Sequence, residues 1–436
     1  MSEDIEVVFS HRSKYPTEIP SLIAYGGELI VCINSLKGIE DEARVYSSVD
    51  GYEWEARLIG VMNFWAYQFF DGKLYVGASN VSGDKTFVFE YDGSEFKKVL
   101  ELSPGGGGGG GLIESLGIFK DFLYAGRRNE IWRTSDGVKW ERVFEFSSNK
   151  SLYQFIEYRS EFYVFEGEPI RAPSRVYCSE DGKKWREYRV YSHVEWFRSH
   201  SPSDRVVLDY PYIADGRGNV YFFDGELNKI FERRQFRQPH NVAIRLKTFE
   251  DRLFIVYGAG TCAPARGEVW VWDNYQLGRL IQLPYGIYDI EVYGDSIYLA
   301  CNNWSGLGGF CESLVVKIPA SMKLETPPIA YSLTSKGIPA ENISFVNELE
   351  TDPIPVLGYS QATLYLLLAG DAELEIEALS LNGSWRTVDR MSIPGGRVVR
   401  SKIECCGRLI RFKLRSKEKN EVKLAEVYLT SLKSLE

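Results

Sequence analysis

Short apolar stretches recur along the first three quarters of the chain, and each follows a polar turn. They lie at 29–31, 74–76, 122–125, 162–164, 253–255 and 297–299, with a blurred copy around 206–208. Apolar runs of this length, rich in β-branched and aromatic residues and bounded by turn residues, predict buried β-strands. The sequence therefore predicts an all-β fold.

A second marker runs in phase with these strands. Its pattern is a hydroxyl residue, any residue, Asp, Gly, two residues and Trp, and clear copies lie at 48–54, 134–140 and 179–185. The Asp can accept backbone N–H bonds, the Gly takes a positive φ, and the Trp packs as the next strand begins. Degenerate copies lie at 91–96, 223–225 and 272–274. We expect a hairpin turn at each copy, with Trp140 and Trp185 buried.

The spacing of these turns predicts a β-propeller. The aspartates stand at positions 50, 92, 136, 181, 224 and 273, so successive intervals run from 42 to 49 residues, the length of one four-stranded blade. We predict seven blades, at 19–60, 61–102, 112–146, 151–190, 191–234, 239–283 and 284–318. The last offers only three strands, and a strand near 5–9 is expected to supply the fourth and close the ring.

The three clear turns resemble the Asp box, or BNR repeat, of sialidase-like propellers, in which such a hairpin joins the outer strands of a blade. This chain has one residue fewer between Asp and Trp than the commonest form. In that family the boxes lie away from the catalytic centre and occur in many non-enzymes, so the resemblance implies a fold. A sialidase-like hydrolase would also imply three arginines around a substrate carboxylate, a Tyr–Glu nucleophile pair and an Asp acid. The family's Arg-Ile-Pro signature is missing, and the nearest string is Ile-Arg-Ala-Pro at 170–173.

A different pattern begins after a proline-containing segment at 319–328. Leu374, Ile376 and Ala378 alternate with glutamates, and a similar alternation with basic residues follows at 410–415. Such two-residue alternation with glycine turns predicts a β-sandwich that is jelly-roll-like. We place the propeller at 1–322 and the sandwich at 323–436.

Composition narrows the function classes. The 436 residues carry a formal net charge of −9, which argues against a nucleic-acid-binding surface. No apolar run is long enough for a membrane span, and the N-terminus has no export signal, so we expect a cytoplasmic or virion protein. Abundant Glu, Lys, Arg and Tyr with only 4 Met would suit a thermophilic source.

Cysteine and histidine usage predicts no metal and no cofactor. The 7 cysteines form no CxxC pair, and the chain has 4 histidines, which argues against a zinc site. Cys301 and Cys311 bracket a glycine-rich loop; we expect both to be reduced and buried, with a disulfide as the alternative. The seven glycines at 105–111 lack the Lys-Ser/Thr pair of a phosphate-binding loop, so we expect a flexible connection between blades.

Loops that join strands two and three of a blade, or one blade to the next, gather on one face of a propeller. Aromatic rings there can stack on sugars, and arginines can bind carboxylates or phosphates. The preferred ligand-binding candidates are Trp65, Arg127, Arg128, Arg171, His240 and Trp304, and the wider set adds Trp196, His200 and Tyr285.

Two functions remain open at this point. The first is a non-catalytic recognition or structural scaffold that binds a glycan or protein through this loop face. Its sandwich would serve for attachment or homo-oligomer assembly, for example in a virus particle or in host recognition. The alternative is a glycoside hydrolase of the sialidase-like class.

Overall fold

The fold was analysed in a computed structural model. It describes residues 5–64, 66–82, 84–103, 112–147, 151–168, 171–191, 212–214, 219–231, 241–249, 252–259, 267–272, 277–304, 311–322, 324, 329–335, 338–340, 343–356, 359–379, 384–404 and 409–431.

The described part of residues 6–319 forms seven separate antiparallel sheets, numbered here by chain position. The first contains β2 (Thr17–Tyr25), β3 (Glu28–Ser35), β4 (Arg44–Ser48) and β5 (Glu55–Ile59), with the short helix η1 (Glu40–Glu42) after β3. The second contains β6 (Val61–Met62), β7 (Tyr67–Phe70), β8 (Lys73–Asn80), β9 (Thr86–Tyr91) and β10 (Phe96–Leu102). The third contains β11 (Ile113–Phe119), β12 (Phe122–Arg127), β13 (Glu130–Thr134) and β14 (Glu141–Glu145). The fourth contains β15 (Ser151–Tyr158), β16 (Glu161–Glu168), β17 (Arg171–Ser179) and β18 (Arg186–Tyr191).

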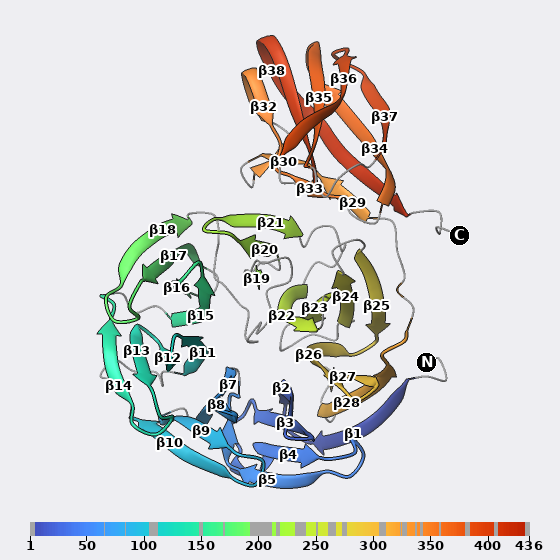
Figure 1. Ribbon diagram of the computed structural model, residues 1–436. Helices are drawn as coiled ribbons and strands as arrows, with labels where there is room; N and C mark the ends of the chain where they lie inside the picture. Colours follow the sequence, from blue (N-terminus) through green and yellow to red (C-terminus); the bar gives the residue numbers. More distant parts are fainter. Residues whose placement is uncertain are drawn as a thin grey trace.

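The remaining three sheets continue the series. The fifth contains β19 (Tyr212–Ala214), β20 (Val220–Phe223) and β21 (Leu227–Phe231). The sixth contains β22 (Asn241–Phe249), β23 (Arg252–Ala259), β24 (Gly267–Trp272) and β25 (Leu277–Leu283), and the seventh contains β26 (Gly286–Tyr293), β27 (Ser296–Trp304), β28 (Cys311–Pro319) and β1 (Glu6–Ser13). The sheets follow one another around a ring (Figure 1). The fold is thus all-β and propeller-like. The expected strand at 206–208 lies outside the described residues.

The first strand of the chain completes the seventh sheet. β1 pairs antiparallel with β28 from Glu6 opposite Lys317 to Ser13 opposite Cys311. Within β1, Phe9 packs against Tyr46 and Trp54 of the first sheet, at ring-centroid distances of 5.2 and 5.1 Å. β1 therefore completes the last sheet and also joins it to the first.

The Asp turns have the predicted hydrogen bonds. Asp50 Oδ1 accepts from the backbone N of Tyr52 and Glu53, and Ser48 Oγ from that of Gly51. The turns at Asp136 and Asp181 have the same acceptor geometry towards the second and third residues after each Asp. These bonds lower the pKa of all three aspartates.

Each Asp turn also packs on the preceding sheet. A Cβ at Gly51 would lie 2.7 Å from Tyr298 Oη of the seventh sheet, and one at Gly137 or Gly182 would collide with Tyr75 or Tyr124. These glycines have φ of +79°, +73° and +70°, which side chains rarely adopt. The turn tryptophans differ: Trp185 is 9% exposed and packs against three phenylalanines, whereas Trp140 is only half-buried.

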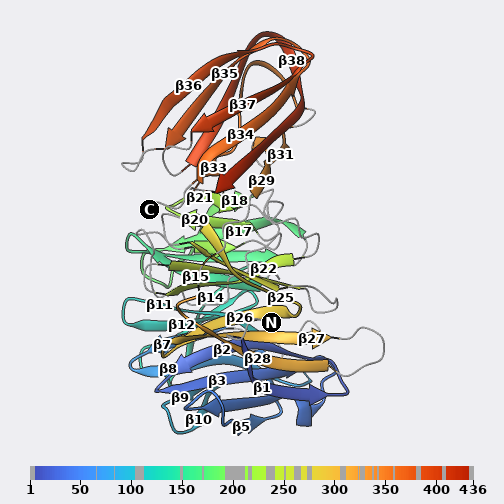
Figure 2. The same cartoon turned by 90° about the vertical axis from the view of Figure 1, so that its right-hand side faces the viewer.

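The C-terminal region has a different topology. It contains β29 (Ile329–Ser332), β30 (Thr334–Ser335), β31 (Ile338–Pro339), β32 (Ser344–Glu350), β33 (Ile354–Pro355), β34 (Tyr359–Leu368), β35 (Ala372–Leu379), β36 (Trp385–Ile393), β37 (Val398–Glu404) and β38 (Leu409–Ser431). The first half of β38 pairs with β32, β33 and β35, and its second half pairs with β29 and β34. Side chains of both strand sets bury a common apolar core. Figure 2 shows this region beyond one side of the ring.

The pairing of β27 with β28 shows whether Cys301 and Cys311 form a disulfide. Cys301 lies opposite Leu314, while Cys311 lies opposite Trp304. Both cysteines are buried and free, so they form no disulfide with each other. Burial also raises the pKa of the Cys301 thiol, which keeps it protonated.

Candidate functional site

Two buried ion pairs lie side by side between the innermost strands of the sixth and seventh sheets. Arg245 Nε on β22 is 3.1 Å from Asp289 Oδ1 on β26, and their side chains are 1% and 0% exposed. Two residues further along each strand, Lys247 Nζ is 2.5 Å from Glu291 Oε2. We call these four residues the charged seam.

The seam residues also form hydrogen bonds with backbone groups on the free inner edge of β2. Asp289 Oδ2 accepts from Leu22 N at 2.8 Å, and Glu291 Oε2 accepts from Ala24 N at 3.0 Å. The two cations donate hydrogen bonds to carbonyls of the same edge. Arg245 Nη2 donates to Pro20 O (2.6 Å), and Lys247 Nζ donates to Leu22 O (3.4 Å). Side chains thus take the place of a neighbouring strand, which protects an edge that would otherwise be unpaired.

Local backbone geometry positions these side chains. The strand register shifts between Ala243 and Arg245 in β22, and between Ile287 and Asp289 in β26. Shifts at the equivalent place precede the buried residues Ser21, Ser115 and Gln154 in the first, third and fourth sheets. A bulge of this kind re-aims the side chain that follows it.

Burial dominates the electrostatics of the seam. It raises the pKa of Glu291, an effect that Lys247 partly offsets. Burial opposes the charge on Lys247, but Glu291, Tyr67 and Asp289 together outweigh it, and the pKa of Lys247 is raised. Each seam carboxylate is committed to a cation and to backbone N–H groups, so neither is placed to act as a solvent-facing acid or base.

A second polar cluster lies where β2 begins. Asn34 Nδ2 donates to Glu18 Oε1 (3.3 Å) and to Asn63 Oδ1 (3.4 Å), and Asn63 Nδ2 donates to Ser79 Oγ (2.7 Å). Asn63 has a φ of +65°, and its backbone N donates to Asn34 Oδ1. The cluster fastens the first sheet to the second. Glu18 is 2% exposed, so this cluster too is internal.

The predicted loop-face residues fall into four groups. Arg127 is 6% exposed and donates to Ser103 O and Glu130, so its polar contacts are internal. Arg128 is half-buried with a φ of +48°, and Tyr285 is half-buried before β26. Arg171 begins β17 and Trp304 ends β27. Trp65, Trp196, His200 and His240 lie outside the described residues. Arg127 and Arg128 are chain neighbours at the end of β12, Arg171 belongs to the fourth sheet, and Tyr285 and Trp304 lie before and within the seventh.

Sequence reasoning missed the charged seam. A signal for it exists, because Arg245 and Lys247, and likewise Asp289 and Glu291, are charges two residues apart within otherwise apolar strands. Such charges on one face of a buried strand require partners.

Across the described residues, no group of three or more His, Cys, Asp or Glu side chains is placed to hold a metal ion. Within the same residues, no helix has the length and apolar character needed to cross a membrane.

The sequence matches no protein-family model and no curated protein. Among solved structures, the chain is similar to a catalytically inactive virginiamycin B lyase from Staphylococcus aureus, with 9% identity and a TM-score of 0.45 over 71% of this chain and 99% of that one. A gluconolactonase from Xanthomonas campestris shares 12% identity at a TM-score of 0.38, covering 72% of this chain and 96% of that one. A glycoside hydrolase shares 10% identity at a TM-score of 0.30, covering 96% of this chain and 100% of that one. Such distant likenesses carry no argument about the activity of this chain.

Proposed function

We propose that this protein is a non-catalytic recognition or structural scaffold that binds a glycan or a protein. Its architecture is a seven-bladed β-propeller at 1–322, closed by the N-terminal strand, followed by a jelly-roll-like β-sandwich at 323–436. Each sheet of the ring is one blade. The ligand is bound at the face that carries the loops between strands two and three and between successive blades, and the sandwich serves for attachment or assembly.

The observation that carries this proposal is that both carboxylates of the charged seam are buried and ion-paired. Hydrolysis by two carboxylates needs a pair set across a cleft, one as an acid and one as a nucleophile or base. Asp289 and Glu291 are instead buried, ion-paired and hydrogen-bonded to backbone. They are well suited to holding blades together and poorly suited to turnover.

Binding at the loop face is tested with a printed array of glycans and a panel of immobilised proteins. The wild-type protein is compared with an Arg128→Ala/Arg171→Ala variant, which alters two loop-face candidates. The matched control is Lys183→Ala/Lys184→Ala, because these exposed lysines lie in an Asp turn at the opposite end of the fourth sheet. We expect the loop-face variant to lose binding and the control to retain it. Equal binding by both variants would contradict the choice of face.

A further inference from the structure

The C-terminal region, which Figure 2 shows beyond one side of the ring, contains a groove. Its volume is about 910 Å³, within the range of sites that bind small molecules. It lies between the β34–β35 turn, the end of β36 and the middle of β38. Its charged lining residues are Asp371, Glu373, Arg415, Lys417, Glu418 and Lys419.

The floor of this groove is held rigidly. Asn420 is 2% exposed, and its side chain accepts from Gly370 N and donates to Gly370 O and Asp371 O. Gly395 packs directly on Gly370, where a Cβ would lie 2.5 Å from the Gly370 Cα. Gly395 N also donates to Asp371 Oδ1. A floor fixed in this way is preorganised and loses little entropy when a ligand binds.

The charges of the groove differ from those of the neighbouring strand face. On that face basic residues of β38 alternate with acidic residues of β32 and β35: Arg411 pairs with Glu350 and Glu377, and Arg415 with Glu348 and Glu375. Around the groove, Glu373, Lys417, Glu418 and Lys419 are exposed, and none has an ion pair among the described residues. Charged side chains are thus ion-paired on the strand face, whereas those that line the groove are exposed and can bind a ligand.

From this arrangement we propose that the groove is a second binding site, separate from the propeller loop face, and that it takes a neutral oligosaccharide. Sugar hydroxyls both donate and accept, so they match ammonium donors and carboxylate acceptors held close together. The lining has three acidic and three basic residues, so it does not select a polyanion. It contains no aromatic side chain, so recognition rests on hydrogen bonds and requires a hydroxyl-rich ligand.

The test uses the full chain on an array that carries neutral, sialylated and sulfated oligosaccharides, followed by titration of the strongest neutral ligand. The test variant is Lys417→Met/Lys419→Met, which removes two donors at exposed positions. The control is Arg386→Met/Lys402→Met, which removes two exposed basic residues of the same region outside the groove. We expect the test variant to bind the neutral ligand about tenfold or more weakly, with the control unchanged.

The proposal is overturned by no binding to any neutral glycan, by binding only to sialylated or sulfated glycans, or by equal loss in both variants. The loop-face variant Arg128→Ala/Arg171→Ala separates the two sites. If it abolishes all glycan binding while the groove variant changes none, the groove proposal fails and the loop-face proposal stands.

Discussion

Arg245 and Asp289 face each other across two neighbouring sheets with almost no exposure to solvent, 3.1 Å apart. Together they hold the inner edge of β2 through Pro20 O and Leu22 N. The first and seventh sheets are therefore joined twice, by β1, which pairs with β28 and packs on the first sheet, and by the charged seam, which binds the edge of β2.

Removing one partner of this pair should be costly. We expect Asp289→Asn to destabilise the fold by about 3–5 kcal/mol, because it removes the carboxylate that pairs with the buried Arg245. The control Glu101→Gln breaks the surface pairs with Lys85 and Lys98 and should cost less than about 1 kcal/mol. Urea denaturation of both variants provides the comparison. Similar midpoints would show that the seam contributes no more than a surface pair.

The outer closure can be probed within β1. Phe9→Ala should cost about 3–5 kcal/mol, since it removes contacts to Tyr46 and Trp54. Val7, which is 43% exposed, gives a control: Val7→Ala should stay within about 0.5 kcal/mol. Thermal unfolding followed by circular dichroism measures both, and an unchanged melting temperature for Phe9→Ala would mean that the contacts of Phe9 with the first sheet add little stability.

Replacing a glycine by alanine should destabilise the fold more in an Asp turn than in an open turn. Gly137→Ala should destabilise by about 2–4 kcal/mol, since a side chain there is strained and collides with Tyr75. Gly72 has a similar φ of +72°, but no atom lies within 4 Å of the position that a Cβ would take, so Gly72→Ala should cost about 1 kcal/mol. Chemical denaturation distinguishes the two costs. If the two costs were equal, the Tyr75 contact would have no energetic weight.

Acid should destabilise the C-terminal region. Thr387 and Arg390, with Arg415, lower the pKa of Glu375 to about 2, against about 4.3 in an unfolded chain. The lowered value means that this stabilisation is present above about pH 4.3 and is lost as the pH falls towards 2. The melting temperature should therefore fall over that window, and less steeply in Glu375→Gln. Parallel wild-type and variant profiles would argue against this role.

The features that could be predicted from the sequence are those formed by residues close together in the chain. The turns at Asp50, Asp136 and Asp181 form because an acceptor, a glycine and a short hairpin lie within a few residues, and their period predicted a propeller-like fold. The prediction that Trp140 and Trp185 are both buried was wrong for Trp140, which is only partly buried. The ring of Trp185 is covered by Phe146, Phe155 and Phe162.

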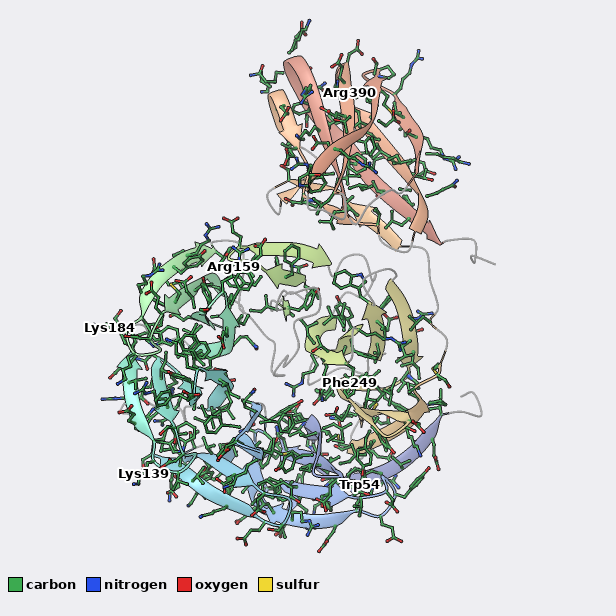
Figure 3. All side chains as sticks on the ribbon, in the orientation of Figure 1. Trp54, Lys139, Arg159, Lys184, Phe249 and Arg390 are labelled. Atoms are coloured by element: carbon green, nitrogen blue, oxygen red, sulfur yellow. The ribbon has the colours of Figure 1, made fainter. Side chains whose placement is uncertain are left out.

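Non-local contacts could not be predicted in the same way. Asp289 and Arg245 lie 44 positions apart and also meet β2 at the other end of the chain, which no local pattern specifies. Arg127 looked like a loop arginine, yet Ser103 O and Glu130 hold it inside. Figure 3 shows how densely side chains fill the ring between sheets, where such contacts form.

The most direct test of the central claim is a turnover assay with a panel of chromogenic glycosides, including a sialoside. If the inner carboxylates are structural, wild-type protein should release chromophore no faster than buffer at any pH from acid to neutral. Release above that rate, abolished in a folded Asp289→Asn or Glu18→Gln variant, would contradict the non-catalytic account.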